Sequence, residues 1–179
     1  MKYCPNCAAP VSSIIPDGDN RLRDVCTQCH SVHYQNPKII AGCIVEYEQK
    51  ILLCKRAIEP RLGLWTIPAG FLENNETTAE GASRETYEES KAQVDQLELF
   101  CLYNIPHISQ IYMIYRARLK VPEYASTEES SEVDLYLEQD IPWDSIAFPV
   151  VTAALEHYFS QRRNGHFHLI IDEIDRRKP

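Results

Sequence analysis

The chain has little that would carry it into a membrane or onto a polyanion. No apolar run approaches the roughly 20 residues of a membrane-spanning helix, and the start MKYCPNC lacks the features of a secretion signal. Acidic residues outnumber basic ones by 26 to 18, and the net charge of −8 disfavours binding driven by phosphate backbones or anionic lipids. Internal repeats and low-complexity segments are also missing. We therefore expect a soluble, cytoplasmic protein without membrane or nucleic-acid partners.

The seven cysteines fall into two groups. Cys4 and Cys7 form one CxxC pair and Cys26 and Cys29 a second, with eighteen residues between the pairs. In a chain without an export signal this spacing is typical of a structural zinc site, because four thiolates leave no open coordination position. Two disulfides are the alternative, which reducing compartments disfavour. The remaining cysteines lie in apolar runs and are predicted to be small core residues: Cys43, Cys54 and Cys101.

The patterns predict two domains. Residues 1–35 have no apolar core of their own and are predicted to form a small zinc ribbon that folds around its metal. Residues 36–179 are predicted to form an α+β domain. Its predicted strands are 39–46, 50–56, 64–67, 93–103, 109–119, 133–137 and 166–171, and its predicted helices are 77–90 and 149–163. The charged tail from Asp172 is expected to be frayed.

Acidic residues are clustered in the first predicted helix. If residues 77–90 are helical, Glu85, Glu88 and Glu89 lie on one face at offsets of three and four. Like charges at this spacing repel by about 0.2–0.5 kcal/mol per pair on an exposed helix. The cluster is therefore either a solvated surface or a site for a hard divalent cation, since Mg²⁺ and Mn²⁺ prefer oxygen ligands.

The spacing resembles the Nudix box, G-x5-E-x7-R-E-U-x-E-E-x-G-U, in which U is an apolar residue. Two positions depart from it: Thr86 replaces an aliphatic residue, and Lys91 replaces a glycine that normally ends the helix in a left-handed conformation, so modest strain is expected there. The resemblance implies the Nudix fold, an α/β/α sandwich with a mixed sheet, and hydrolysis of pyrophosphate bonds with Mg²⁺ or Mn²⁺. The matching positions are Gly70, Glu76, Arg84, Glu85, Glu88, Glu89 and Ala92.

The resemblance also implies roles for individual residues. Arg84 is expected to hold a glutamate by a charge-assisted hydrogen bond and to pair with Glu76. The general base in the family is either a box glutamate, here Glu85, or an acid on a later loop. That loop offers three acids, and we predict Glu132 because it directly precedes a predicted strand. The implied metal ligands are the carboxylates of Glu85, Glu88 and Glu89 and the backbone carbonyl of Ala69.

Two further residues are candidates for binding the substrate. Arg56 ends the second predicted strand of the larger domain and is a candidate phosphate contact, with a plain surface charge as the alternative. Trp65 lies in the lead-in to the box and could stack on a base, with a core position as the alternative.

Two Nudix subgroups share an N-terminal zinc ribbon. The NADH pyrophosphatase and RNA NAD-decapping type carries SQPWPFPxS after the box, and that signature is missing here. The chain instead resembles ADP-ribose and FAD pyrophosphatases in PAGFLE, GASRETxEE and IPxxxQxY. The resemblance implies a homodimer that cleaves FAD to FMN and AMP, or ADP-ribose to AMP and ribose 5-phosphate. NADH or NAD-capped RNA hydrolysis and a non-catalytic nucleotide-sensing regulator are the alternatives.

Overall fold

The computed structural model describes residues 1–175, and the chain divides into two units, residues 1–36 and residues from 37 onward. The first unit is a three-stranded antiparallel sheet in the order β1-β2-β3. Its small core is formed by Cys4, Ala9 and Cys26, so a bound metal has to supply much of its folding free energy. The strands are β1 (Val11–Ile14), β2 (Arg23–Cys26) and β3 (Val32–His33).

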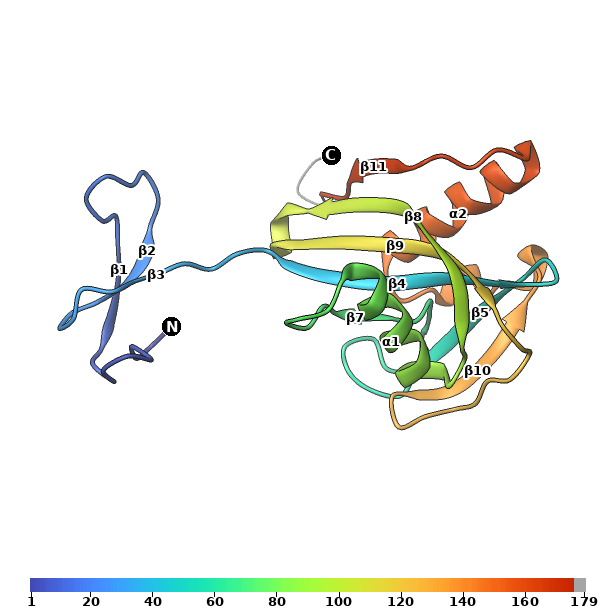
Figure 1. Ribbon diagram of the computed structural model, residues 1–179, viewed down its shortest axis with the longest axis horizontal. Helices are drawn as coiled ribbons and strands as arrows, with labels where there is room; N and C mark the ends of the chain where they lie inside the picture. The colour runs from blue at the N-terminus through green and yellow to red at the C-terminus, as the bar shows by residue number, and fades with distance from the viewer. Residues whose placement is uncertain (176–179) are drawn as a thin grey trace. The chain divides into compact units, whose positions relative to one another are not determined.

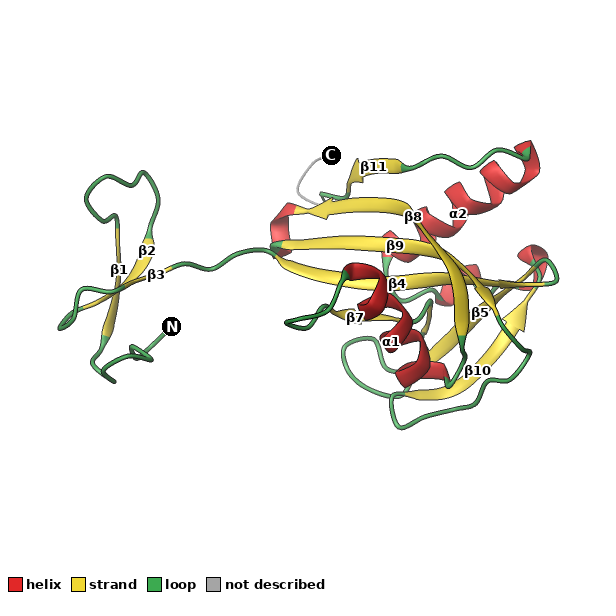
Figure 2. Cartoon of the chain, in the orientation of Figure 1, coloured by secondary structure: helices red, strands yellow, loops and turns green. Residues whose placement is uncertain are grey.

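The second unit is built on an eight-stranded sheet with one helix on each face (Figures 1 and 2). The strands are β4 (Lys38–Tyr47), β5 (Lys50–Arg56), β6 (Trp65–Thr66), β7 (Ala69–Phe71), β8 (Val94–Ile105), β9 (Gln110–Leu119), β10 (Ser130–Tyr136) and β11 (Ile170–Glu173). The helices are α1 (Thr78–Ser90) and α2 (Pro149–Asn164), with short 3₁₀ turns at η1 (Pro106–Ile108), η2 (Glu138–Asp140) and η3 (Trp143–Ser145).

The sheet is mixed. Its strand order is β10-β5-β4-β9-β8-β11, with β6 beside β5 and β7 beside β4. Neighbouring strands run antiparallel except for β4 with β9 and β8 with β11, which are parallel. Within residues 1–175, no helix is long and apolar enough to span a bilayer.

The central strand β4 is buried on both faces, which explains its nearly continuous apolar sequence. Alternate side chains enter two separate cores. Cys43 and Val45 pack on one face with Ala82 of α1, whereas Ile44 packs on the other face with Leu155 of α2. The predicted α/β/α sandwich with a mixed sheet is therefore confirmed.

The ends of α1 explain how the box is held. Thr77 caps the helix: its side chain accepts the N–H of Glu80, and the Glu80 carboxylate accepts the N–H of Thr77. At the other end Lys91 adopts φ 57°, the left-handed conformation that glycine takes more readily. Lys91 therefore adopts the conformation in which strain is expected, while its N–H still donates to the Tyr87 carbonyl.

The last strand lies later in the chain than the sequence predicts. β11 begins at Ile170 rather than at His166, and it pairs in parallel with β8, Ile170 beside Cys101. Asp172 belongs to this strand, so the expectation of fraying from Asp172 is wrong for the strand residues. Residues 176–179 of the predicted tail lie outside the described residues.

Candidate active site and zinc site

Glycine at position 70 lets a carboxylate of the helix lie directly against the backbone of β7. A Cβ atom at Gly70 would lie 2.2–2.4 Å from the carboxyl atoms of Glu85, so a larger residue here would displace that carboxylate. β7 is in turn pressed against β4, where a Cβ on Gly42 would lie 2.3 Å from the Cβ of Ala69. These two close approaches place the Glu85 carboxylate of α1 beside β7, and β7 beside β4.

Arg84 binds the acidic residues of the box together. Its Nε and Nη2 atoms donate to the two oxygens of Glu76 at 2.9 and 2.8 Å, and Nη2 also donates to the Phe71 carbonyl at 3.1 Å. Its Nη1 atom donates to Glu85 and to Glu88, at 2.9 Å each. The hydrogen bonds from Arg84 lower the pKa of Glu76 to about 2. The predicted pairing of Glu76 with Arg84 is present, and it ties the loop before α1 to the helix.

Glu89 is the buried member of the cluster. Its residue is 6% exposed, and its Oε2 atom accepts the N–H of Ala69 at 3.2 Å. Burial raises the pKa of Glu89 to about 8, and the charge of Glu85 adds to this rise. Burial also raises the pKa of Glu85, against the opposing effect of Arg84. Two partly desolvated carboxylates of like charge form an environment that a bound cation would stabilise.

The donor set fits a hard divalent cation. It consists of carboxylate oxygens from one helix beside the backbone of the β7 turn, and both kinds of oxygen are ligands that Mg²⁺ and Mn²⁺ accept. The third carboxylate, Glu88, has a side chain that is 54% exposed and therefore faces solvent. The roles of Glu85, Glu88, Glu89 and Ala69 as ligands stay predictions.

The structure brings a different loop acid to the box from the one that the sequence favours. Glu132 lies on β10 with its side chain 56% exposed, and it forms an ion pair with Lys55 at 2.6 Å. Glu129 instead lies near enough for its charge to raise the pKa of both Glu85 and Glu89, where burial is the main cause. Glu129 is therefore the loop acid whose charge acts on the box carboxylates, and the choice of Glu132 as the base stays a prediction.

The reason for this difference is local. A bulge in β10 between Ser130 and Glu132 breaks the regular pairing with β5, and Glu132 is thereby aligned with Lys55. Glu132 therefore lies within β10, where its carboxylate pairs with Lys55. A threonine two residues before Glu129, Thr127, accepts the Glu129 N–H at 3.2 Å and shapes the turn that carries it.

Arg56 contacts a residue that lines an apolar pocket, and its charge also acts on the box. Its charge opposes the rise in the pKa of Glu89 and also that of Tyr112, each caused mainly by burial. Its guanidinium lies over the ring of Phe148, 5.4 Å from the centroid, and its Nε atom donates to the Pro60 carbonyl at 2.7 Å. Arg56 therefore lies against Phe148, which lines the pocket, and its role as a phosphate contact stays a prediction.

The pocket has a volume of about 200 Å³ and lies between the η1 turn and the beginning of α2. Phe148 immediately precedes α2, and its importance for the site was not predicted from the sequence. A pocket with an apolar lining and a few polar groups suits a flat aromatic ring. Residues lining it include Arg61, Ile105, His107, Ile108, Tyr112 and Phe148.

Trp65 does not line this pocket. It is 8% exposed and packs edge-on against Tyr136, with ring centroids 5.2 Å apart. Its backbone carbonyl also accepts the N–H of Ala147 at 2.8 Å. The structure thus corrects the expectation that Trp65 stacks on the substrate and places it in the core.

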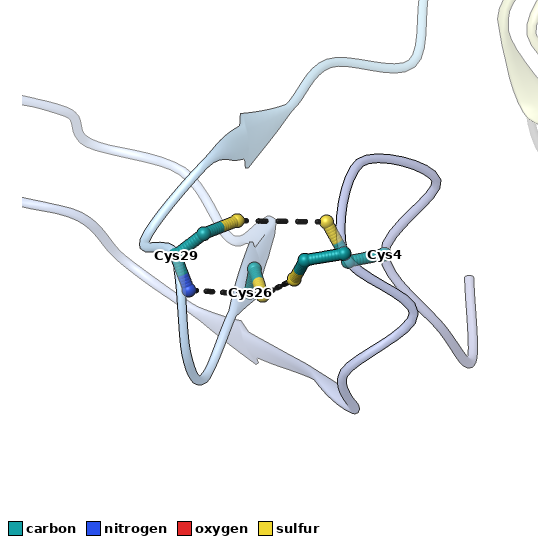
Figure 3. A group of neighbouring side chains, drawn as sticks. Cys4, Cys26 and Cys29 are labelled. Carbon is teal, nitrogen blue, oxygen red and sulfur yellow. Dashed lines mark hydrogen bonds between the residues drawn. The ribbon is translucent and has the colours of Figure 1, made fainter.

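The four predicted zinc-binding cysteines come together in the first unit. Their sulphur atoms all lie within 4.8 Å of one another. The Cys4 and Cys29 sulphurs are 3.7 Å apart (Figure 3), and those of Cys7 and Cys26 are 3.4 Å apart. A tetrahedron of thiolates at the usual Zn–S distance has edges of about 3.8 Å. The cluster therefore fits one tetrahedral zinc ion.

Local hydrogen bonds favour the thiolate forms of two of the four cysteines, Cys26 and Cys29, by lowering their pKa values. The hydroxyl of Ser31 lowers the pKa of Cys29 to about 6. The backbone N–H of Cys29 lowers the pKa of Cys26, and this N–H lies 3.4 Å from the Cys26 sulphur (Figure 3). Such N–H···S bonds accompany the turns in which CxxC pairs bind metal.

Together, the sandwich fold and the carboxylate-bearing helix define a class of hydrolase that uses divalent cations. The family model for the NUDIX domain matches residues 36–150, and that for the Nudix N-terminal zinc ribbon matches residues 2–35. The chain therefore belongs to the Nudix hydrolase family, which confirms the resemblance found in the sequence. A NUDIX hydrolase from Nitrosomonas europaea has a similar structure: it is 51% identical, with a TM-score of 0.92, over 97% of this chain and 100% of that one.

Two curated relatives differ in the activity that their names give. An NAD-capped RNA hydrolase NudC from Edwardsiella ictaluri is 28% identical over 145 residues, 79% of this chain and 53% of that protein. An ADP-ribose pyrophosphatase from Methanocaldococcus jannaschii is 36% identical over 73 residues, 41% of this chain and 43% of that protein. The chain thus spans about half the length of these curated relatives.

Proposed function

We propose that this protein hydrolyses the pyrophosphate bond of a nucleoside diphosphate that is linked to a second group, with ADP-ribose or FAD as substrate and AMP as a product. The observation that carries the proposal is the position of Arg56. Its guanidinium lies over the ring of Phe148, which lines the apolar pocket, and its charge lowers the pKa of Glu89 against the larger effect of burial. A substrate that joins phosphates to an aromatic base would use a carboxylate cluster for a cation, an arginine for a phosphate and an apolar pocket for the base.

The chain's own residues can position both reactants. Arg56 would bind a phosphate oxygen, and the pocket would hold the adenine ring. Arg84 keeps the box carboxylates in place through its hydrogen bonds to Glu85 and Glu88. A divalent cation held by Glu85, Glu88, Glu89 and the Ala69 carbonyl would neutralise phosphate charge and make a nearby water more acidic.

Glu129 completes the reaction as the general base. It would take a proton from the attacking water while the water oxygen forms a bond to phosphorus. The bond from phosphorus to the bridging oxygen then breaks, and the bridging oxygen leaves with the other phosphate. ADP-ribose and water thereby give AMP and ribose 5-phosphate, and FAD and water give FMN and AMP.

The substrate is tested with a panel of ADP-ribose, FAD, NADH and NAD-capped RNA, each with Mg²⁺ in ¹⁸O-labelled water. We expect the highest kcat/KM for ADP-ribose or FAD, with products identified by mass spectrometry. The label identifies the phosphorus atom that water attacks. A preference for NAD-capped RNA would favour the activity named for the NudC relative instead, and binding without cleavage of any substrate would favour a sensor.

Neutralising Glu129 is expected to lower kcat by about 10²- to 10⁴-fold, because this is the usual contribution of a positioned general base. Glu129→Gln keeps the shape and removes the base. Glu128→Gln is the matched control, since Glu128 is the exposed neighbouring acid. Steady-state kinetics of these two variants and of Glu132→Gln decide the assignment. Loss of activity in Glu132→Gln with full activity in Glu129→Gln would restore the original choice of base.

Zinc is proposed as the resident metal of the first unit, held by Cys4, Cys7, Cys26 and Cys29. Four sulphur ligands leave no open position, so its part is structural. A homodimer remains a proposal that follows from the resemblance alone, and a location in the cytoplasm remains a proposal that follows from the sequence.

A further inference from the structure

The hydroxyl of Thr127 connects the loop before β10 to the end of the box helix. It donates to the backbone carbonyl of Glu89 at 3.3 Å. It also accepts the N–H of Glu129 at 3.2 Å and that of Ser130 at 3.1 Å. A hydroxyl has one donor and two acceptor positions, so this single side chain uses its full hydrogen-bonding capacity within the site.

The carbonyl that Thr127 binds belongs to the last turn of α1. Carbonyls in the last turn of a helix have no partner within the helix, and two of them here are bound by the same loop. Thr127 binds that of Glu89, and the N–H of Ala125 donates to that of Ser90 at 2.8 Å. Two hydrogen bonds therefore tie this loop to the end of α1.

The backbone of Glu129 is held from both sides. Its N–H donates to the Thr127 hydroxyl, and its carbonyl accepts the N–H of Ala57, just after β5, at 2.8 Å. The Glu129 residue is otherwise exposed, so its carboxylate can face the box carboxylates while its backbone stays fixed. Of these two hydrogen bonds of the Glu129 backbone, the one from its N–H is made to a side chain, that of Thr127.

We propose that Thr127 is a positioning residue for the hydrolysis: its hydroxyl sets the place of Glu129 relative to the carboxylates of α1. The inference rests on the proposed role of Glu129 as the base. It follows from one geometric fact, that Glu89 supplies both a carboxylate to the box and the carbonyl to which the Glu129 turn is bound. Carboxylates and base then keep a constant separation, which catalysis requires to within a fraction of an ångström.

The test compares Thr127→Val, which keeps the shape and removes the hydroxyl, with Thr127→Ser, which keeps the hydroxyl. The probe is Mg²⁺-dependent hydrolysis of ADP-ribose, or of the best substrate in the panel. We expect Thr127→Val to lower kcat by roughly 10- to 100-fold, the effect of a misplacement of up to 1 Å, with KM nearly unchanged. Thr127→Ser is expected to restore most of kcat, and Ser126→Ala at the exposed neighbour is the matched control.

The double variant Thr127→Val/Glu129→Gln separates positioning from a structural role. If Thr127 acts through Glu129, the double variant is no slower than Glu129→Gln alone, because coupled residues are not additive. An equal further loss in the double variant would overturn the inference, as would wild-type kcat in Thr127→Val. Both results leave Glu129 as the base, whereas full activity in Glu129→Gln would refute the base and the inference together. Melting temperatures identify folded variants, and Thr127→Ala replaces Thr127→Val if the latter does not fold.

Discussion

Replacing Glu89 with glutamine is expected to lower kcat/KM by roughly 100-fold or more, because a bound divalent cation contributes several kcal/mol to charge stabilisation in such reactions. Glu89 is the most buried carboxylate of the box and lies against the backbone of Ala69. Glutamine keeps the size of the side chain but cannot supply a charged ligand. Steady-state hydrolysis of ADP-ribose over a range of Mg²⁺ concentrations measures the loss.

The stability of the same variant should change in the opposite direction. Burial raises the folded-state pKa of Glu89 to about 8, above the unfolded value of about 4.3. The ionised group therefore destabilises the metal-free fold increasingly as pH rises through this window. We expect Glu89→Gln without metal to melt no lower than the wild type at pH 8. Full activity in this variant, beside an active Glu156→Gln control on α2, would refute the metal-binding role.

Removing one zinc ligand is expected to unfold the first unit and leave catalysis largely intact. Cys26→Ser takes away one of four thiolates from a unit whose core is formed by Cys4, Ala9 and Cys26. Structural zinc in small domains supplies on the order of 10 kcal/mol of apparent binding free energy, so the unit cannot remain folded without it. The melting temperature and the zinc content measured by mass spectrometry should both fall. Turnover per folded molecule should change by less than about threefold, because a closed zinc site takes no part in chemistry.

Gln28→Ala is the matched control for this prediction, because Gln28 lies in the same turn and contacts the cluster through its backbone N–H. It should keep one zinc ion per chain. Loss of catalysis in Cys26→Ser with unchanged melting would contradict a structural zinc and would assign the ribbon a part in the reaction.

The box itself could be predicted from the sequence because its information is local. Helical spacing alone places Glu85, Glu88 and Glu89 on one side of α1, and the box spacing locates Arg84 and Gly70. The cysteine pairs are equally local, since each pair forms one turn. The long strands were also predictable, because their apolar runs are long enough to outweigh uncertainty at the ends.

The partners of the loop acids could not be predicted, because they depend on a β-bulge and on pairing between distant segments. The loop sequence alone does not show that Glu132 forms an ion pair with Lys55, or that the Thr127 hydroxyl donates a hydrogen bond to the carbonyl of Glu89. Trp65 was misjudged for a similar reason: its burial depends on Tyr136 and on the segment before α2. The bounds of β11 differ from the predicted ones because the position of a short edge strand depends on its pairing with β8 rather than on its own sequence pattern.

An anomalous difference map at the manganese edge tests the central claim most directly. The crystals would contain Mn²⁺ and an ADP-ribose analogue in which a methylene group replaces the bridging oxygen. We predict a manganese peak bound by carboxylate oxygens of Glu85 and Glu89, with the analogue's phosphates beside Arg56. A bound analogue with no manganese among the α1 carboxylates would contradict the account.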